Sequence, residues 1–305
     1  MVTKSETLSF VLKQVIPAQI SSTIPNVKKE FMIAKMFDHP SLVKYQDLFI
    51  TPERVIFQME YCSLGSLQLL LSRESLRGEQ QELPEVWDIL LDLLCGLDAL
   101  HRASIVHLDI KPGNIFITPD IKRKRRVKIG DFGTCVYSGS LVSEDGDGVY
   151  IAPELVKSHN VRADPRNDIF SLGVTLYEMG THCDMNSQIW TKLQDVGQRR
   201  ELQWERMSEK LQEVVARAVQ GIDERPSVSA LLQEPALKEV AKKHGVVLPP
   251  VTAYPVNEES NESCAVSIEG RNDSPQNNCC FVKERNKTRK PIDTELISIR
   301  RRLFT

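Results

Sequence analysis

Residues His107-Leu108-Asp109-Ile110-Lys111-Pro112-Gly113-Asn114 form the stretch that decides the fold of this chain. Two shorter motifs follow it in order, Asp131-Phe132-Gly133 and Ala152-Pro153-Glu154. A single tripeptide is common by chance, but these motifs in this order and at this spacing are very specific. We therefore interpret them as parts of one functional unit and not as ordinary turn residues.

The residue types in these motifs fit the transfer of a phosphoryl group. A carboxylate must orient the attacking hydroxyl group and accept its proton, and we expect Asp109 to do so. Lys111 can place positive charge near the γ-phosphoryl group. Magnesium prefers oxygen ligands, which Asn114 and Asp131 would provide. The sequence thus predicts two catalytic residues, Asp109 and Lys111, and two metal ligands, Asn114 and Asp131.

The order of these motifs resembles the protein kinase superfamily, from about residue 7 to about residue 245. This resemblance implies an α+β, bilobal protein-kinase-like fold, with ATP and Mg²⁺ as cofactors. We expect a small, incomplete β-rich N-lobe at about 1–61 and a larger helical C-lobe at about 62–245. Residues 246–305 are expected to form a disordered tail with a basic C-terminus, because Asn, Ser, Glu and Pro dominate there.

Further residues match the ATP-binding landmarks of that superfamily. Lys13 ends the strand-like run Phe10-Val11-Leu12-Lys13 and matches the lysine that contacts the α- and β-phosphates. Glu30, ten residues before Pro40, matches the ion-pair partner of that lysine on the following helix. Glu60 and Cys62 lie in the segment that matches the hinge, whose backbone would bind adenine.

Three other positions match residues that support the site. Asp168 corresponds to the aspartate that braces the catalytic loop, and we expect it on a helix that is apolar on almost all sides. Glu154 and Arg225 correspond to the buried ion pair of the large lobe. Their expected role is structural.

Local patterns give the expected helices and strands. β-branched and aromatic residues predict strands, and apolar residues at helical spacing predict helices. The expected strands are residues 7–16, 42–50 and 54–62, and the expected helices are 26–37, 86–100 and 168–179, with more helices up to about residue 244.

Composition excludes several classes of protein. The 305 residues have a formal net charge of 39 − 41 = −2, so no basic field suggests nucleic-acid binding. No apolar run approaches the roughly 18 to 20 residues that span a bilayer. Seven cysteines, an odd number without CxxC spacing, argue against a disulfide framework or a zinc site. We therefore expect a monomer in a reducing compartment, with neither nucleic acid nor membrane as a partner.

Two features depart from the kinase pattern. None of the twelve residues before Lys13 is a glycine, so the phosphate-covering glycine-rich loop is missing. We interpret this as an N-terminally truncated form or an open-topped pocket, with weak or absent catalysis. Leu108 replaces the arginine that normally pairs with a phosphate on the activation segment. Activity is therefore expected not to require phosphorylation of that segment.

Within the superfamily, the chain resembles the Wee family of cell-cycle inhibitory kinases. The features that carry this resemblance are Gln58–Cys62, Leu108, Asn114–Ile117, Gly146-Asp147 and Trp190. The resemblance implies phosphorylation of a tyrosine, and in some members the neighbouring threonine, in a cyclin-dependent kinase, which delays mitotic entry. Lys111-Pro112-Gly113-Asn114 itself has the Ser/Thr-kinase form. The membrane-associated branch of the family carries an apolar anchor after the domain, and none is found here.

Two basic segments bear on partners and location. Arg301, Leu303 and Phe304 resemble the docking peptide that cyclins bind, so cyclin joins the cyclin-dependent kinase as an expected partner. The basic C-terminus and the run Lys122–Arg126 are candidate nuclear-import signals, although a solvated hairpin turn is the better interpretation of the run. We expect the protein in the nucleus, with the cytoplasm as a second location.

Two alternatives remain open. The chain also shares the Asn-Ile-Phe sequence at 114–116 with Ser/Thr kinases that act on a translation initiation factor. A truncated, catalytically inactive protein could instead bind cyclin complexes as a scaffold. The missing glycine-rich loop favours the scaffold, whereas Lys13, Asp109 and Asp131 oppose it.

Overall fold

The computed structural model describes residues 9–15, 20–51, 54–76, 83, 85–142, 148–157, 160–251 and 254. The chain divides into two compact units, residues 1–262 and 263–305. All described residues belong to the first unit.

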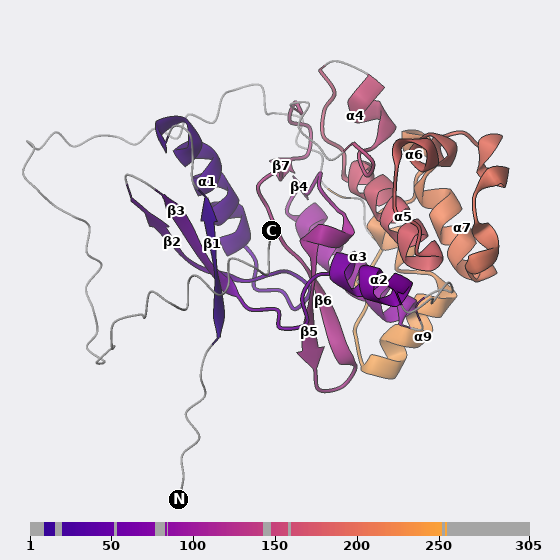
Figure 1. Ribbon diagram of the computed structural model, residues 1–305, viewed down its shortest axis with the longest axis horizontal. Helices are drawn as coiled ribbons and strands as arrows, with labels where there is room; N and C mark the ends of the chain where they lie inside the picture. Colours follow the sequence, from indigo (N-terminus) through magenta and orange to yellow (C-terminus); the bar gives the residue numbers. More distant parts are fainter. Residues whose placement is uncertain are drawn as a thin grey trace, which may run out of the picture. The chain divides into compact units, whose positions relative to one another are not determined.

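A three-stranded antiparallel sheet lies in the N-terminal part of the chain (Figure 1). Its strands are β1 (Phe10–Val15), β2 (Tyr45–Ile50) and β3 (Val55–Glu60), in the order β1-β3-β2. Alternate residues of the central strand β3 are buried, because successive side chains of a strand point to opposite faces. The register places Lys13 of β1 opposite Phe57 of β3.

Helix α1 (Ile20–Lys35) connects β1 to β2 and contacts β2. Val27, Glu30 and Ala34 are buried on one side of the helix, at the spacing of an amphipathic helix. The helix predicted from residue 26 begins earlier, and Pro25 lies inside it. A proline lacks the backbone N–H that a helix interior needs, which is why the sequence pattern places the start too late.

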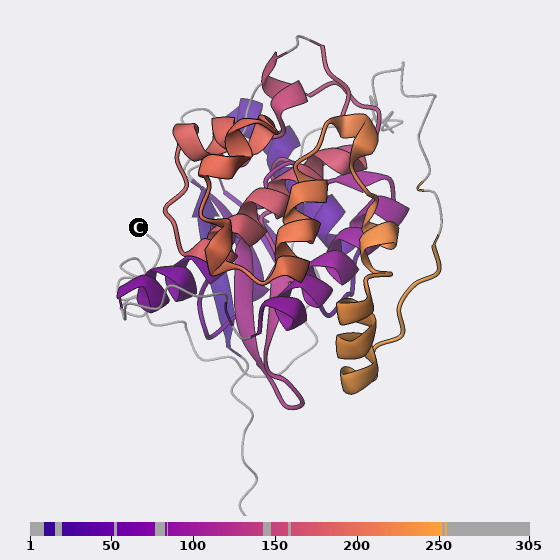
Figure 2. The same ribbon diagram turned by 90° about the vertical axis from the view of Figure 1, so that its right-hand side faces the viewer.

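The C-terminal region is mainly helical. It contains α2 (Leu67–Leu76), α3 (Val86–Arg102), α4 (Pro153–Lys157), α5 (Pro165–Thr181), α6 (Ser187–Gln194), α7 (Glu209–Ala218), α8 (Val228–Leu231) and α9 (Pro235–His244). Nearly every residue of α5 is buried, and α5 packs against α3 and α7. Helices α6, α7 and α9 lie toward the viewer in Figure 2. The α+β architecture predicted from the sequence is confirmed.

Two short pairs of antiparallel strands position the motif residues. Strand β4 (Ile105–Val106) pairs with β7 (Val136–Tyr137), and β5 (Ile115–Asp120) forms a hairpin with β6 (Lys124–Ile129). Residues 107–114 therefore form the loop between β4 and β5, which ends in a short 3-10 helix, Pro112–Asn114. Asp131 lies two residues after the end of β6 at Ile129, so both motifs lie near the ends of paired strands.

The basic run Lys122–Arg126 spans the end of the β5–β6 turn and the first three residues of β6. Arg123 donates to the buried Asp92 of α3 at 2.7 Å. Arg126 lies 3.2 Å from Asp120, and Arg125 lies 3.3 Å from Glu85. These three arginines are held in ion pairs, which favours a structural role for them over an import signal.

The described chain continues past α9. Val246, Leu248 and Tyr254 are partly buried against the core, and the backbone oxygen of Pro250 accepts a hydrogen bond from Arg102 at 3.0 Å. The tail boundary at residue 246 stays a prediction, but the part of the tail that is described packs on the helical region. Among the described residues, no helix combines the length and apolar character needed to cross a lipid bilayer.

Candidate active site

Lys13 contacts two carboxylates that come from distant parts of the chain. Its Nζ lies 3.0 Å from Glu30 Oε1 on α1 and 2.9 Å from Asp131 Oδ1 after β6. The expected ion pair between Lys13 and Glu30 is therefore present. The second contact brings the sheet and the Asp131-Phe132-Gly133 motif together.

These contacts favour the charged forms of Lys13 and Asp131. Burial alone would lower the pKa of Lys13, but Glu30 and Asp131 outweigh it and raise the pKa above its ordinary value. Burial would raise the pKa of Asp131, but the attraction and hydrogen bond of Lys13 outweigh it and lower the pKa. At neutral pH, Lys13 is thus a cation facing an ionised Asp131.

Tyr45 holds Glu30 from the other side. Its hydroxyl donates to Glu30 Oε1 at 2.8 Å, the oxygen that also accepts from Lys13. The Tyr45 ring packs edge-on against Phe57 and Phe132, at centroid distances of 5.5 and 5.7 Å. No sequence pattern marks Tyr45, because a single tyrosine in a strand looks like any other core residue.

The catalytic-loop residues form a second polar group. Asn114 Nδ2 donates to Asp109 Oδ2 at 2.6 Å and to the Asp109 backbone oxygen at 2.9 Å. Lys111 Nζ lies 3.1 Å from Asp109 Oδ1. Both Asp109 oxygens are thus oriented by neighbours in the same loop, as a base that must meet a hydroxyl group requires.

The two predicted metal ligands lie on connected backbone. Gly130 N donates to the Asn114 backbone oxygen at 2.9 Å, which joins the catalytic loop to the residue before Asp131. Asn114 uses Nδ2 for Asp109, so only its Oδ1 could ligate a cation. Among the described residues no three His, Cys, Asp or Glu side chains cluster as a metal site. One carboxylate and one amide oxygen nevertheless fit Mg²⁺, which usually keeps water and phosphate oxygens as its other ligands.

Asp168 of α5 braces the catalytic loop, as expected. Its carboxylate is fully buried and accepts from the backbone N–H groups of His107 at 2.9 Å and Leu108 at 2.8 Å. His101 Nε2 lies 2.8 Å from the same carboxylate. Leu108 has a left-handed backbone, φ 66°, which costs a non-glycine residue on the order of 1–3 kcal/mol. The hydrogen bond to Asp168 helps to hold this conformation.

The predicted hinge residues lie where β3 ends. The Glu60 carboxylate lies 2.8 Å from Lys128 Nζ on β6 and accepts from Lys44 N at 3.2 Å. Its side chain is thus engaged by protein groups, so any contact with adenine falls to the backbone. Cys62 is buried, and burial raises the pKa of its thiol to about 12. The thiol is therefore protonated and unreactive at neutral pH.

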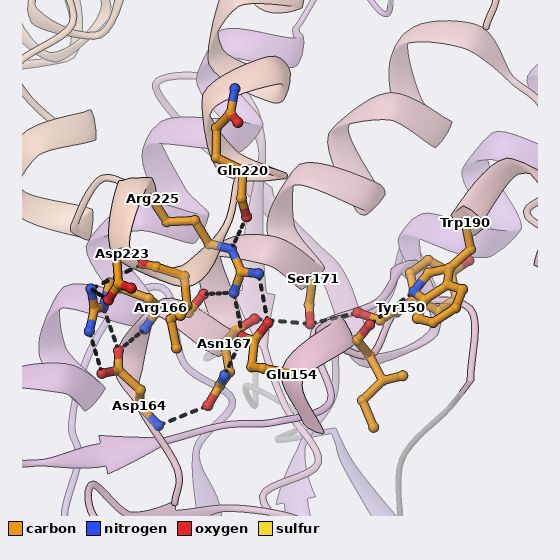
Figure 3. Close-up of polar contacts among 12 residues, drawn as sticks. Tyr150, Glu154, Asp164, Arg166, Asn167, Ser171, Trp190, Gln220, Asp223 and Arg225 are labelled. Atoms are coloured by element: carbon orange, nitrogen blue, oxygen red, sulfur yellow. Dashed lines mark hydrogen bonds and ion pairs between the residues drawn. The ribbon is translucent and has the colours of Figure 1, made fainter. Parts of the chain in front are cut away.

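The Ala152-Pro153-Glu154 motif is anchored to the helical region (Figure 3). Arg225 donates to Glu154 Oε2 at 2.7 Å, and Asn167 donates to Glu154 Oε1 at 2.7 Å. Ser171 and Trp190 donate to the backbone oxygens at 150 and 151, at 2.8 and 2.9 Å. The expected ion pair between Glu154 and Arg225 is present, and these bonds fix the segment that follows residue 148.

A buried carboxylate lies beside this segment. The Tyr150 hydroxyl donates to Glu178 Oε2 at 2.6 Å. Burial raises the pKa of Glu178 to about 7; the Tyr150 bond lowers it and Asp184 raises it. No sequence pattern marks Glu178, since a glutamate on a predicted helix usually faces water.

Some of the predicted residues cannot be placed. Gly146 and Asp147, which support the Wee resemblance, lie outside the described residues, as do Arg301, Leu303 and Phe304.

The fold, the ion pair of Lys13 and the two motif groups define a class of protein. Residues 1–237 match the family model described as protein kinase domain, so the chain belongs to the protein kinase family. Members of this family are phosphotransferases, and a kinase domain implies ATP and a divalent metal ion.

Several curated protein kinases are similar to this chain in sequence. The human Wee1-like protein kinase 2 is 34% identical over 45% of this chain and 28% of its own length. The Drosophila melanogaster membrane-associated tyrosine- and threonine-specific cdc2-inhibitory kinase is 32% identical over 67% of this chain and 37% of its own. A probable protein kinase of Dictyostelium discoideum is 35% identical over 53% of this chain and 45% of its own length. The chain spans less than half the length of each.

Proposed function

We propose that this protein is a kinase of Wee type, which uses ATP and Mg²⁺ to phosphorylate a tyrosine of a cyclin-dependent kinase and so delays mitotic entry. The neighbouring threonine is a second acceptor in this proposal. The observation that supports it is the contact of Lys13 with both Glu30 and Asp131, because it joins β1, α1 and the Asp131-Phe132-Gly133 motif. Similarity to kinases named as Wee1-like and cdc2-inhibitory supports the substrate.

The proposed roles follow from the contacts of each side chain. Asp109, oriented by Asn114 and Lys111, would accept the proton of the substrate hydroxyl group. Lys111 would also stabilise negative charge on the transferred group. Lys13, held by Glu30, would bind phosphate oxygens, and the backbone at Glu60 and Cys62 would hold adenine. Asn114 and Asp131 would hold the divalent cation, which neutralises phosphate charge when it is bound.

Phosphate transfer to a purified cyclin-dependent kinase–cyclin complex tests the proposal. We expect radiolabel from γ-labelled ATP to appear as phosphotyrosine, identified by phosphoamino-acid analysis. Asp109→Asn should lower kcat by about 100- to 10,000-fold while nucleotide binding is retained. Asp223→Asn is the matched control, since the side chain of Asp223 is 94% exposed and lies outside the motif groups.

Other outcomes select the alternatives. Phosphoserine alone, or transfer only to a translation initiation factor, would overturn the Wee assignment and favour the Ser/Thr kinase. Binding of the cyclin complex with no phosphate transfer would favour a catalytically inactive scaffold.

Docking and location are separate parts of the proposal. We place the protein in the nucleus and propose that Arg301, Leu303 and Phe304 bind cyclin, with the arginine meeting acidic residues and the Leu-Phe pair an apolar groove. Alanine substitution of the three residues should abolish pull-down of cyclin. Unchanged pull-down would reject the docking peptide without affecting the catalytic proposal.

A further inference from the structure

The segment after α9 binds the C-terminal end of α3 at two points. We refer to residues 246–251 and 254 as the strap. Tyr254 Oη donates to Asp98 Oδ1 at 2.9 Å, although 156 residues separate them. Arg102 donates to Asp98 Oδ2 at 2.7 Å and to the Pro250 backbone oxygen at 3.0 Å. Asp98 and Arg102 thus tie the strap to one turn of α3.

Tyr254 also covers a buried histidine. Its ring packs edge-on against the His101 imidazole, with centroids 5.4 Å apart and an interplanar angle of 83°. Ser229 supplies further hydrogen bonds to the Tyr254 hydroxyl. His101 has no exposed surface, and its Nδ1 has no hydrogen-bond partner within the described part of the chain. The Tyr254 ring therefore helps to exclude water from an unsatisfied nitrogen.

His101 leads directly to the catalytic loop. Because the Asp168 carboxylate can only accept, His101 Nε2 carries the hydrogen of their 2.8 Å contact. The same carboxylate binds the backbone N–H groups of His107 and Leu108. Leu108 precedes the proposed base, Asp109, so a single carboxylate connects the imidazole under Tyr254 to the position of that base.

We propose that Tyr254 is a positioning residue, which acts through His101 and Asp168 to fix the backbone of the catalytic loop. Without the ring, water would reach His101 Nδ1 and the imidazole would gain other orientations. Asp168 would then keep its two backbone donors but lose a fixed third partner. The expected effect is a looser loop and not a collapsed fold.

Hydrogen exchange of the 305-residue chain tests this without requiring activity. In Tyr254→Ala we expect the amides of a peptide covering residues 105–111 to exchange about tenfold faster. The reference is the β5–β6 hairpin, where the Val127 amide binds Asp92 and should exchange at the wild-type rate. Phe49→Ala is the matched control, because the Phe49 side chain is exposed and lies on β2, which pairs with β3 and not with residues 105–111.

A milder variant separates the hydroxyl group from the ring. Tyr254→Phe keeps the contact with His101 but loses the bond to Asp98, and it should speed the same amides by roughly threefold, because the strap then opens more often. Wild-type exchange of residues 105–111 in either folded variant would overturn the proposal. If Tyr254→Ala does not fold, Tyr254→Phe decides alone.

The role in catalysis rests on the proposed kinase function, and a second readout addresses it. If the protein transfers phosphate, Tyr254→Ala should lower kcat about tenfold with the KM for ATP unchanged, because the loop and not the nucleotide site is affected. An equal loss in kcat from Phe49→Ala would contradict this. Faster exchange without any phosphate transfer would leave the coupling intact and count against the proposed function.

Discussion

The hydroxyl group of Tyr45 and the Nζ of Lys13 bind the same oxygen of Glu30, at 2.8 and 3.0 Å. Glu30 is almost completely buried, so its carboxylate depends on these two donors. A buried carboxylate that loses a donor destabilises the fold, because water cannot replace the lost bond.

Tyr45→Phe should therefore lower the free energy of unfolding by about 2 kcal/mol, which is the usual range for a hydrogen bond to a charged group. Affinity for ATP should fall about three- to tenfold, since Glu30 then holds Lys13 less firmly. Denaturant unfolding and titration with a fluorescent nucleotide measure the two effects. Tyr137→Phe is the control and should change neither; wild-type values for Tyr45→Phe would show that the hydroxyl group is dispensable.

The raised pKa of Glu178 predicts that the stability of the fold depends on pH. Its pKa is about 7 in the folded protein and 4.5 in the absence of the fold, so the folded state retains the proton longer. Stability should fall as pH rises from about 4.5 to about 7, by roughly 3 kcal/mol. Glu178→Gln mimics the protonated side chain and should remove this fall. Parallel curves for the two proteins in urea titrations from pH 4 to 8 would refute the prediction.

The buried ion pair between Arg123 and Asp92 predicts a large loss of stability when the arginine is removed. Burial outweighs Arg123 and raises the pKa of Asp92, so the aspartate already lies in a costly environment. Arg123→Ala should lower the free energy of unfolding by about 3–5 kcal/mol, because it leaves Asp92 buried without its cation. The neighbouring Lys122 is exposed, and Lys122→Ala should cost less than about 0.5 kcal/mol. Similar costs for the two variants would show that the pair is not important for stability.

Leucine at position 108 predicts that kinase activity does not depend on phosphorylation of the activation segment. The position lacks the cationic side chain that would bind a phosphate there, and its backbone is held by Asp168 instead. Treatment with a phosphatase should leave kcat for phosphate transfer within about twofold of the untreated protein. A loss of activity that returns after autophosphorylation would contradict this.

The sequence predicted the parts of the fold that have a local cause. The helix 168–179 is observed within α5, and the strand 54–62 contains β3, because their apolar patterns agree with their burial. The predicted start of α1 is wrong because Pro25 locally disfavours a helix. Packing of the buried side of α1 stabilises the helix in spite of this proline. Lys13 and Glu30 could be paired only through the family resemblance, not through their spacing.

Residues that act through tertiary contacts could not be found in the sequence. The Tyr45 ring packs on Phe57 and Phe132, and only this packing aims its hydroxyl group at Glu30. Tyr254 lies in a polar stretch that predicts disorder, and its hydrogen bond to Asp98 spans 156 residues. No local pattern marks either residue, since each depends on partners distant in sequence.

The ion pair between Glu154 and Arg225 has a consequence for synthesis in the cell. The two residues lie 71 positions apart, so the ribosome adds Arg225 roughly 4 to 14 s after Glu154. Until then the Glu154 carboxylate lacks its partner Arg225, although the residues of α5, α6 and α7 have already been added. A nascent chain stalled before residue 225 should therefore be cut by a protease near residue 150, and one stalled well beyond it should resist.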